Sequence, residues 1–253
     1  MHVEDGPVRR VTFDRPGARN AMTAAVAREL ADALADLNPA DHDAVLITGE
    51  GEAFSAGGDI AAMADREESA SEAYERVRTT LGRVAEEVLT APVPVVAKVN
   101  GDAVGAGLSL AALADFAYAA GSARFGATFV SVGLVPDMGG TAILPRTIGL
   151  RATKDLAFTG RLLSAREAAG IDLINEAVPD ETLDGRVADL VETLRDRPTE
   201  SIALAKRAIH DNLGASWREG LDREAHIQAL AYDTDAHTEG VAAFLEDRET
   251  EFE

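Results

Sequence analysis

The stretch NGDAVGAGLSLAALAD, residues 100–115, joins a glycine-rich turn to a continuous apolar run. It follows VVAKV at 95–99, a short β-branched segment that is typical of a buried strand. Glycines at such a junction let the backbone turn sharply and approach a ligand closely. A helix beyond the turn offers free N–H groups and a partial positive charge at its N-terminus. The stretch therefore predicts a strand–turn–helix unit whose turn can hold an oxyanion.

Two further passages repeat this strand-then-glycine pattern. FSAGGDI at 54–60 follows the apolar segment AVLIT at 44–48. GLVPDMGGT at 133–141 follows a strand expected to start near Phe125. The repetition of strand and turn, with helices between, predicts an α/β protein.

The remaining elements are expected on both sides of these passages. A strand is predicted at 8–14, a helix capped by Thr23 follows it, and a charged helix is expected over about 71–89. From residue 151 the pattern is mostly helical, with one strand expected at 173–178. We predict a core domain at 1–197 and a helical region at 198–253, which has too few apolar residues to fold alone.

Composition excludes several classes of protein. The chain has 253 residues, 46% of them apolar, enough for one large core. It has no cysteine, which excludes disulfides, thiolate metal sites and cysteine nucleophiles. No apolar run approaches the roughly 18 residues that span a bilayer, and MHVEDGPVRR lacks the apolar segment of a secretory signal. We therefore expect a cytoplasmic protein that does not bind a membrane.

The charge of the chain is strongly acidic. Forty-four Asp and Glu against 24 Lys and Arg give a net charge of −20. Lysine occurs only three times, at Lys98, Lys154 and Lys206. Such a surface is typical of adaptation to high salt, where repulsion is screened within about 3 Å at 1 M. No basic stripe exists to neutralise phosphates, so a nucleic acid partner is not expected.

The sequence excludes other glycine-loop sites and the common metal sites. A phosphate-binding loop needs a Gly-Lys pair, which the chain lacks. Gly105-Ala106-Gly107 begins a dinucleotide fingerprint, but Leu110 stands where its last glycine belongs. The five histidines show no metal-ligand spacing. We therefore expect neither a metal nor a redox cofactor.

The three glycine passages occur in the order and spacing of the enoyl-CoA hydratase/isomerase (crotonase) family, which the chain resembles over nearly its whole length. FDRPGARNAM near the N-terminus and TEGVAAFLEDR near the C-terminus are also similar to that family. The resemblance implies a spiral of ββα units completed by a C-terminal helical region used in trimerisation, with trimers that often pair into hexamers. It also implies an acyl-CoA thioester substrate, with coenzyme A as part of the substrate.

The resemblance assigns site residues by position. The oxyanion donors would be the backbone N–H groups of Ala56 and Ala106, with Gly57 and Gly105 beside them in the substrate site. Two such donors hold a thioester oxygen as negative charge develops on it. The adenine pocket of the family would be formed around three further residues, Ala18, Asp59 and Ile60.

The acid–base positions depart from the hydratase pattern. Hydratases of the family use two glutamates, and those positions here hold Ser109 and Phe129, which we expect to line the substrate site. One carboxylate remains in the region, Asp137 of GLVPDMGGT. Several relatives place a catalytic aspartate in this loop, and the loop is most similar to that of the phenylacetate-pathway epoxyacyl-CoA isomerases. Asp137 is therefore the candidate catalytic acid–base, although Pro-Asp is also common in turns.

These observations favour an enoyl-CoA double-bond isomerase, or a related ring-opening isomerase. An enoyl-CoA hydratase and a non-catalytic acyl-CoA binding subunit are the alternatives. A serine peptidase, which shares the spiral fold, is disfavoured because no G-x-S-x-G occurs and no histidine is expected near Ser109.

Overall fold

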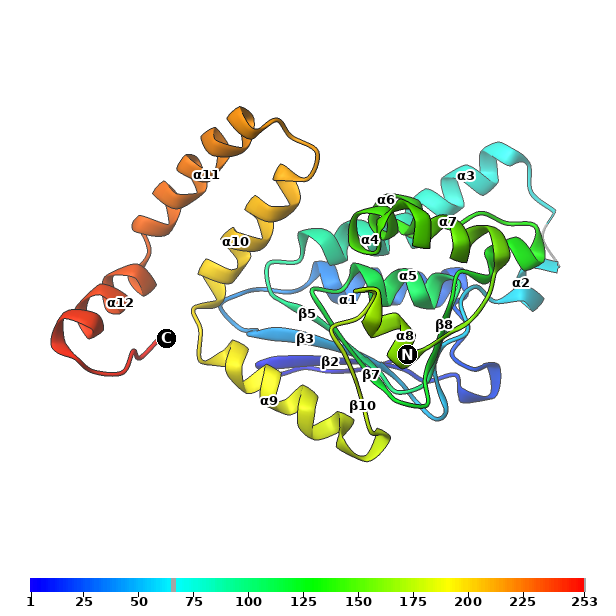
Figure 1. The fold of residues 1–253 in the computed structure, drawn as a ribbon, viewed down its shortest axis with the longest axis horizontal. Helices are drawn as coiled ribbons and strands as arrows, with labels where there is room; N and C mark the ends of the chain where they lie inside the picture. Colours follow the sequence, from blue (N-terminus) through cyan, green and yellow to red (C-terminus); the bar gives the residue numbers. More distant parts are fainter. Residues whose placement is uncertain (65–66, 253) are drawn as a thin grey trace.

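The protein is described here from a computed structural model that covers residues 1–64 and 67–252. Within these ranges a six-stranded sheet forms the centre of the fold (Figure 1). Neighbouring strands pair in parallel, except for the antiparallel first pair. Val45, Ile47, Val95 and Val99 are fully buried, as expected for parallel strands with both faces covered. In spatial order the strands are β1 (His2–Glu4), β2 (Val8–Phe13), β3 (Ala44–Gly49), β5 (Val95–Val99), β7 (Phe116–Ala120) and β10 (Glu176–Val178).

A second, four-stranded sheet collects the short strands that follow those of the first. β4 (Ala53–Ser55), β6 (Asp102–Val104) and β8 (Arg124–Gly126) pair in parallel, and β9 (Leu163–Ser164) closes the edge in antiparallel fashion. The chain thus adds one strand to each sheet and then a helix, turn after turn. This confirms the predicted α/β class and the spiral of ββα units.

The helices between the strands cover one face of the larger sheet. α1 (Ala24–Ala35) begins at Thr23, whose hydroxyl accepts the Val26 N–H, and α4 (Leu81–Thr90) packs against α1. α5 (Ala106–Leu113) is apolar except for Ser109 and lies inside the core. α9 (Leu183–Arg195) lies on the opposite side of the sheet (Figure 1). The remaining short helices are η1 (Pro16–Ala18), α2 (Ile60–Ala64), η2 (Thr128–Val132), α8 (Ala165–Gly170) and η3 (Asp180–Thr182).

Two predicted elements differ from the structure. The charged helix expected over about 71–89 is two helices, α3 (Ala70–Thr79) and α4, because Thr80 leaves the helical region with φ −118° and ψ −92°. The buried Thr80 hydroxyl donates to the Arg76 carbonyl oxygen at 2.6 Å, which fixes the end of α3. The strand expected at 173–178 is reduced to its last three residues, β10.

The last three helices form an arm that stands away from the sheets (Figure 1). We call α10 (Thr199–Asn212), α11 (Trp217–Tyr232) and α12 (Asp235–Glu246) the helical arm. The buried residue of α10 is Lys206, whose ammonium group donates to Asp115 Oδ2 at 2.7 Å and to the Val88 carbonyl oxygen at 2.8 Å. An ion pair therefore joins α10 to the core, together with Ile202, which packs against the core.

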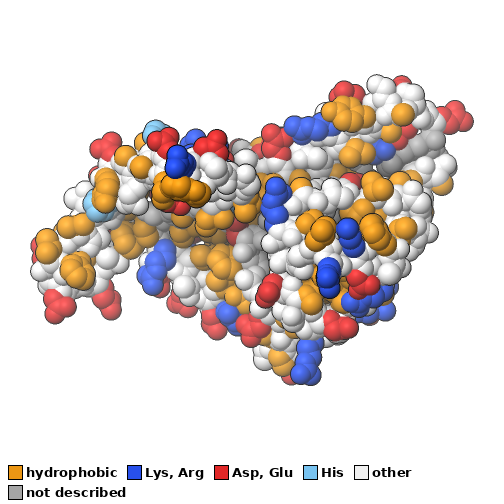
Figure 2. Space-filling model, turned by 45° about the horizontal axis from the view of Figure 1, so that its top comes forward, with side chains coloured by type: hydrophobic (Ala, Val, Ile, Leu, Met, Phe, Trp, Pro, Cys, Tyr) orange, Lys and Arg blue, Asp and Glu red, His pale blue; other side chains and the backbone are white. Residues whose placement is uncertain are grey.

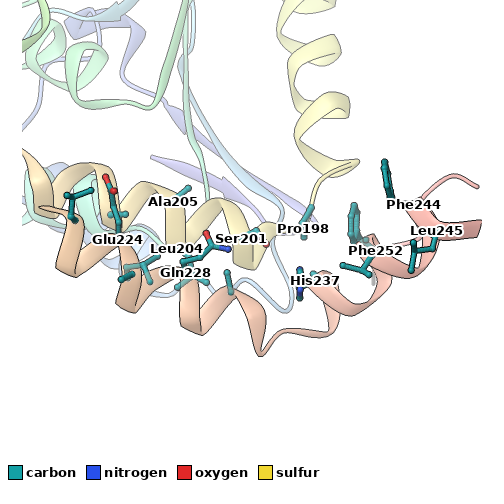
Figure 3. A pocket seen from close by; sticks show the side chains of 18 residues that line it. Pro198, Ser201, Leu204, Ala205, Glu224, Gln228, His237, Phe244, Leu245 and Phe252 are labelled. Carbon is teal, nitrogen blue, oxygen red and sulfur yellow. The ribbon is translucent and has the colours of Figure 1, made fainter. Parts of the chain in front are cut away.

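The helical arm exposes its apolar side chains. Trp217 is 69% exposed and Phe244 is 85% exposed. A cavity of about 1100 Å³ lies between the three helices, with Phe244 and Leu245 at one end and Glu224 at the other (Figure 3). Patches of this kind mark interaction surfaces. The trimerisation role of residues 198–253 stays a prediction.

Acidic side chains are spread over the face shown in Figure 2, and apolar ones gather along the helical arm. No helix in residues 1–64 and 67–252 is long and apolar enough to cross a membrane.

Candidate active site

Two glycine turns meet where β4 and β6 end. The two strands are parallel neighbours, so their carboxyl ends lie at the same edge of the smaller sheet. Gly57 and Gly105 have φ values of +84° and +55°, in the region that favours glycine. A Cβ atom on Gly57 would lie 2.7 Å from the Val104 carbonyl oxygen and 3.2 Å from the Ala106 nitrogen. The two turns are therefore in direct contact, and Gly57 has no room for a side chain.

Ala106 is the first residue of α5 and is almost fully buried. The helix ladder starts with the Ser109 N–H, which donates to the Gly105 carbonyl oxygen at 3.1 Å. In the described part of the chain the Ala106 N–H has no acceptor, as expected for the first turn of a helix. It is free to donate to a ligand oxygen, and the oxyanion role that the resemblance implies for Ala106 stays a prediction.

Ala56 is not available in the same way. Its N–H donates to the Arg19 carbonyl oxygen at 2.9 Å, and the Gly57 N–H donates to Ser55 Oγ at 3.2 Å. Met22 forms a parallel β-bridge with Gly58. The Met22 N–H donates to the Gly57 carbonyl oxygen, and the Met22 carbonyl oxygen accepts the Asp59 N–H. This corrects the assignment of Ala56, because its donor already has a partner within the fold.

The Gly58 N–H replaces that of Ala56 as the candidate donor. Because the bridge bonds flank Gly58, its N–H points away from Met22. It makes no hydrogen bond to any residue that the structure describes. Sequence reasoning missed Gly58, because only the pairing with residues 19–22 shows which N–H groups of the FSAGGDI motif are occupied.

The three residues assigned to the adenine pocket lie on two adjoining segments. Ala18 is exposed at the end of η1, and Ile60 is 53% exposed at the start of α2. Asp59 pairs with Arg15 at 2.9 Å and accepts the Ala62 N–H at 3.1 Å. The Ala62 hydrogen bond first, and then Arg15, lower the pKa of Asp59. The Asp59 carboxylate is thus used to hold α2 and the N-terminal segment together.

Asp137 lies in the turn between η2 and α6 (Gly140–Thr147), which leads on to α7 (Gly149–Thr159). Its carbonyl oxygen accepts the Gly140 N–H at 2.8 Å and the Ser109 hydroxyl at 3.1 Å. Ser109 stands three residues after Ala106 on α5, on the same face of that helix. The Asp137 turn is therefore fixed one helical turn from the Ala106 donor.

The Asp137 side chain is half-buried, and its Oδ1 atom is buried with no hydrogen-bond partner within the described ranges. Burial raises the pKa of Asp137 to about 6, against the lowering effect of its own backbone N–H and of Arg76. A buried polar atom without a partner costs free energy, and such groups mark functional sites. A carboxylate with this pKa can both take up and release a proton near neutral pH.

Ser109 and Phe129 carry no acid–base group to this site. Ser109 is 1% exposed, and its hydroxyl is held by the Asp137 carbonyl. Phe129 is 7% exposed in η2, and its ring edge would lie 4.0 Å from a Cβ atom on Gly105. Phe129 therefore forms an apolar wall beside the glycine turn.

No group of three or more His, Asp or Glu side chains in residues 1–64 and 67–252 is placed to hold a metal ion. The chemistry available to the described residues consists of two backbone donors, at Gly58 and Ala106, and one half-buried carboxylate, that of Asp137.

Comparison with known proteins decides the family. Residues 4–253 match the model of the enoyl-CoA hydratase/isomerase family. The chain belongs to this family. A probable enoyl-CoA hydratase of Rhodobacter capsulatus is 37% identical, over 96% of this chain and 93% of that protein. The 1,2-epoxyphenylacetyl-CoA isomerase of Escherichia coli is 35% identical, over 99% of this chain and 96% of that protein.

The crotonase fold is shown by solved structures of this family. The structure of an enoyl-CoA hydratase from Bacillus anthracis superposes with a TM-score of 0.92 at 31% identity. The match covers 99% of this chain and 98% of that one, so it includes the helical arm. Enzymes named as hydratases and as isomerases are similar to this chain to nearly the same degree, so overall identity does not choose between the two reactions.

Proposed function

We propose that this family member is an acyl-CoA isomerase that moves a carbon–carbon double bond by way of a thioester enolate. The observation that carries the proposal is the Asp137 carboxylate, whose Oδ1 atom is buried without a partner in a turn that is hydrogen-bonded to Ser109, one helical turn from Ala106. The E. coli isomerase, 35% identical to this chain, supports the presence of isomerase chemistry among its relatives. A ring-opening isomerisation would use the same groups.

The proposed reaction moves one proton. With a 3-enoyl-CoA, the Asp137 carboxylate takes a proton from Cα, and the electron pair shifts onto the thioester oxygen to give a dienolate. The N–H groups of Gly58 and Ala106 hold this oxygen, and loss of one such donor costs about 10²–10³ in rate. Asp137 then returns its proton to Cγ, and the double bond comes to rest between Cα and Cβ. Atoms and charge balance without a second acid.

Hydration requires more than the site provides. An attacking water must lose a proton to a base while the α-carbon gains one, which in this family is the work of two glutamates. Ser109 and Phe129 stand at those positions, and neither is a carboxylate. The absence of both acids favours isomerisation over hydration.

Hydration remains the second candidate, because the R. capsulatus relative is named as a probable hydratase. A direct assay separates the two. Purified protein is incubated in molar salt with a 3-enoyl-CoA and, in parallel, with a 2-enoyl-CoA, and the products are resolved by retention time and mass. We expect isomerisation to exceed hydration by about tenfold or more. Faster hydration under matched conditions would overturn the proposal.

A further inference from the structure

Two buried polar residues lie behind the glycine turn that carries Gly58. Asn20 is 1% exposed, and Ser55 is fully buried. The Ser55 hydroxyl donates to the Asn20 carbonyl oxygen at 2.9 Å and accepts the Gly57 N–H at 3.2 Å. The hydroxyl thus uses its donor and an acceptor position at once. It links the N-terminal segment to the N–H groups of the turn.

The backbone path of residues 19 and 20 directs two carbonyl groups at this turn. Arg19 and Asn20 both have positive φ, +49° and +56°, a region in which asparagine is one of the few favourable side chains. The Arg19 carbonyl oxygen accepts the Ala56 N–H at 2.9 Å, while that of Asn20 accepts the Ser55 hydroxyl. Two successive N–H groups of the turn are therefore occupied, the first by Arg19 directly and the second through Ser55.

The Asn20 side chain holds this backbone path in place. Its Oδ1 atom accepts the Arg15 N–H at 2.9 Å, and its Nδ2 group donates to the carbonyl oxygens of Glu50 and Ala53, at 2.9 and 2.7 Å. Gly49 leaves the space for this amide, because a Cβ atom there would lie 2.7 Å from Nδ2. Residues 19 and 20 cannot change conformation without breaking these buried hydrogen bonds, which costs free energy.

Ser55 also contacts the second glycine turn. A Cβ atom on Gly107 would lie 3.0 Å from the Ser55 Cβ atom, so glycine is needed at this close approach. Gly107 follows Ala106, the other candidate donor, on α5. Ser55 therefore lies between the segment that carries the first candidate donor and the helix that carries the second.

We propose that Asn20 and Ser55 are positioning residues that select Gly58 as an oxyanion donor, an inference that rests on the enolate chemistry of the proposed function. Because the N–H groups of Ala56 and Gly57 are occupied, the Gly58 N–H is the next one left for a ligand oxygen. Loss of the Ser55 hydroxyl leaves the Gly57 N–H without its acceptor, and the turn moves to satisfy it. The candidate donor is then displaced from the oxyanion.

Ser55→Ala tests the proposal, because it removes the hydroxyl alone. The site is probed with a saturated acyl-CoA that carries carbon-13 at the thioester carbonyl. Hydrogen bonds from the two donors polarise the bound carbonyl and move its resonance downfield from that of the free thioester. We expect Ser55→Ala to lose about half or more of this displacement, and kcat with a 3-enoyl-CoA to fall about 10–100-fold at a KM within a few-fold of the parent. Ser55→Cys, whose thiol is a weaker donor and acceptor, should give intermediate values.

Asn20→Asp tests the other end of the same hydrogen bond. The carboxylate keeps the size of the side chain and the acceptor for the Arg15 N–H, but it cannot donate to Glu50 and Ala53. We expect a loss of carbonyl displacement like that of Ser55→Ala. Combining the two substitutions should add little to either one, because both act through the hydrogen bond between residues 20 and 55.

Thr48→Val is the matched control. The half-buried Thr48 hydroxyl donates to the Lys98 carbonyl oxygen at 2.9 Å and to Asn100 Oδ1 at 3.3 Å, both outside residues 54–60. Valine has nearly the same shape, so the control also loses one hydroxyl that donates to the backbone. We expect a lower melting temperature in Thr48→Val with the carbonyl resonance and kcat of the parent.

The outcomes separate this inference from the proposed function. Reduced displacement in Ser55→Ala and Asn20→Asp, with Thr48→Val like the parent, supports the positioning role. Parent-like displacement in both variants overturns that role, whatever their melting temperatures. If the parent polarises the carbonyl but does not isomerise a 3-enoyl-CoA, the proposed function fails and the resonance still decides the positioning role. A parent without any displacement overturns both, because no donor then acts on the thioester oxygen.

Discussion

The glycine turns at the carboxyl ends of β4 and β6 differ from the helical arm in how their shape is fixed. The turns are closed by contacts within the chain, so that a single methyl group on Gly57 would meet the Val104 carbonyl oxygen. The helical arm leaves Trp217 and Phe244 exposed and holds α10 to the core through Lys206. The turns are therefore fixed by contacts within the described chain, whereas the arm has an apolar surface that the described residues leave uncovered.

The largest expected effect is that of substituting Asp137, the candidate acid–base of the turn region. Asp137→Asn keeps size and hydrogen bonding but removes the base, so turnover should fall about 10²–10⁴-fold with acyl-CoA binding within a few-fold of the parent. Burial raises the pKa of Asp137 to about 6, above its value in the unfolded chain. Ionisation of Asp137 therefore lowers the free energy of unfolding as the pH rises through about 4 to 6. The variant should therefore melt at a higher temperature than the parent at pH 8. Retention of more than half of the activity would make Asp137 a turn residue.

The next effect concerns the link between arm and core. Lys206→Met should lower the free energy of unfolding by about 3 kcal/mol or more, because it leaves Asp115 without its partner. Replacing both groups, with Lys206→Met and Asp115→Leu together, should recover only part of this loss, because Asp115 Oδ2 also accepts the N–H of the buried Val95 at 2.7 Å. The control is Arg207→Met, which breaks an exposed pair with Asp211 and should cost less than about 1 kcal/mol. Equal losses for Lys206→Met and Arg207→Met in urea unfolding would contradict the buried link.

A third comparison uses one glycine from each region. Gly57 and Gly214 have similar φ values, +84° and +87°, but a Cβ atom at Gly214 would meet nothing within 4 Å. Gly214→Ala should cost about 1–2 kcal/mol of stability from backbone strain alone. Gly57→Ala adds a clash with the Val104 carbonyl oxygen and should lower the free energy of unfolding by about 2–4 kcal/mol. Turnover should also be lost, because the clash displaces Ala106. Equal melting temperatures and activities for the two variants would show that the turn is not tightly closed.

The smallest effect concerns salt. With a net charge of −20, we expect a trimer or a pair of trimers that is loosened at about 0.1 M salt, where screening extends to about 10 Å. The melting temperature should fall by a few degrees relative to molar salt, and sedimentation should show dissociation. A monomer in both buffers with an unchanged melting curve would contradict both the assembly and the salt adaptation.

The strand–turn–helix order and the family could be inferred from the sequence, because motif spacing and local turn chemistry carry them; the roles of Ala106 and Asp137 stay predictions. The available donor at Gly58 could not, because the bond from Ala56 to Arg19 arises only when distant segments pair. The break between α3 and α4 at Thr80 could not be predicted either, because helix propensity alone favours one continuous helix there.

The choice of the Gly58 and Ala106 N–H groups as candidate donors bears on how a member of this family can change its reaction. Both candidate donors are peptide groups, so side-chain substitution cannot delete them while the backbone keeps its path. Positions 109, 129 and 137, by contrast, contribute side chains around the glycine turn, and these side chains can be exchanged without changing the backbone. Mutational drift at these three positions can therefore exchange one acid–base arrangement for another on an unchanged scaffold, which makes them the first choice for redesigning this enzyme.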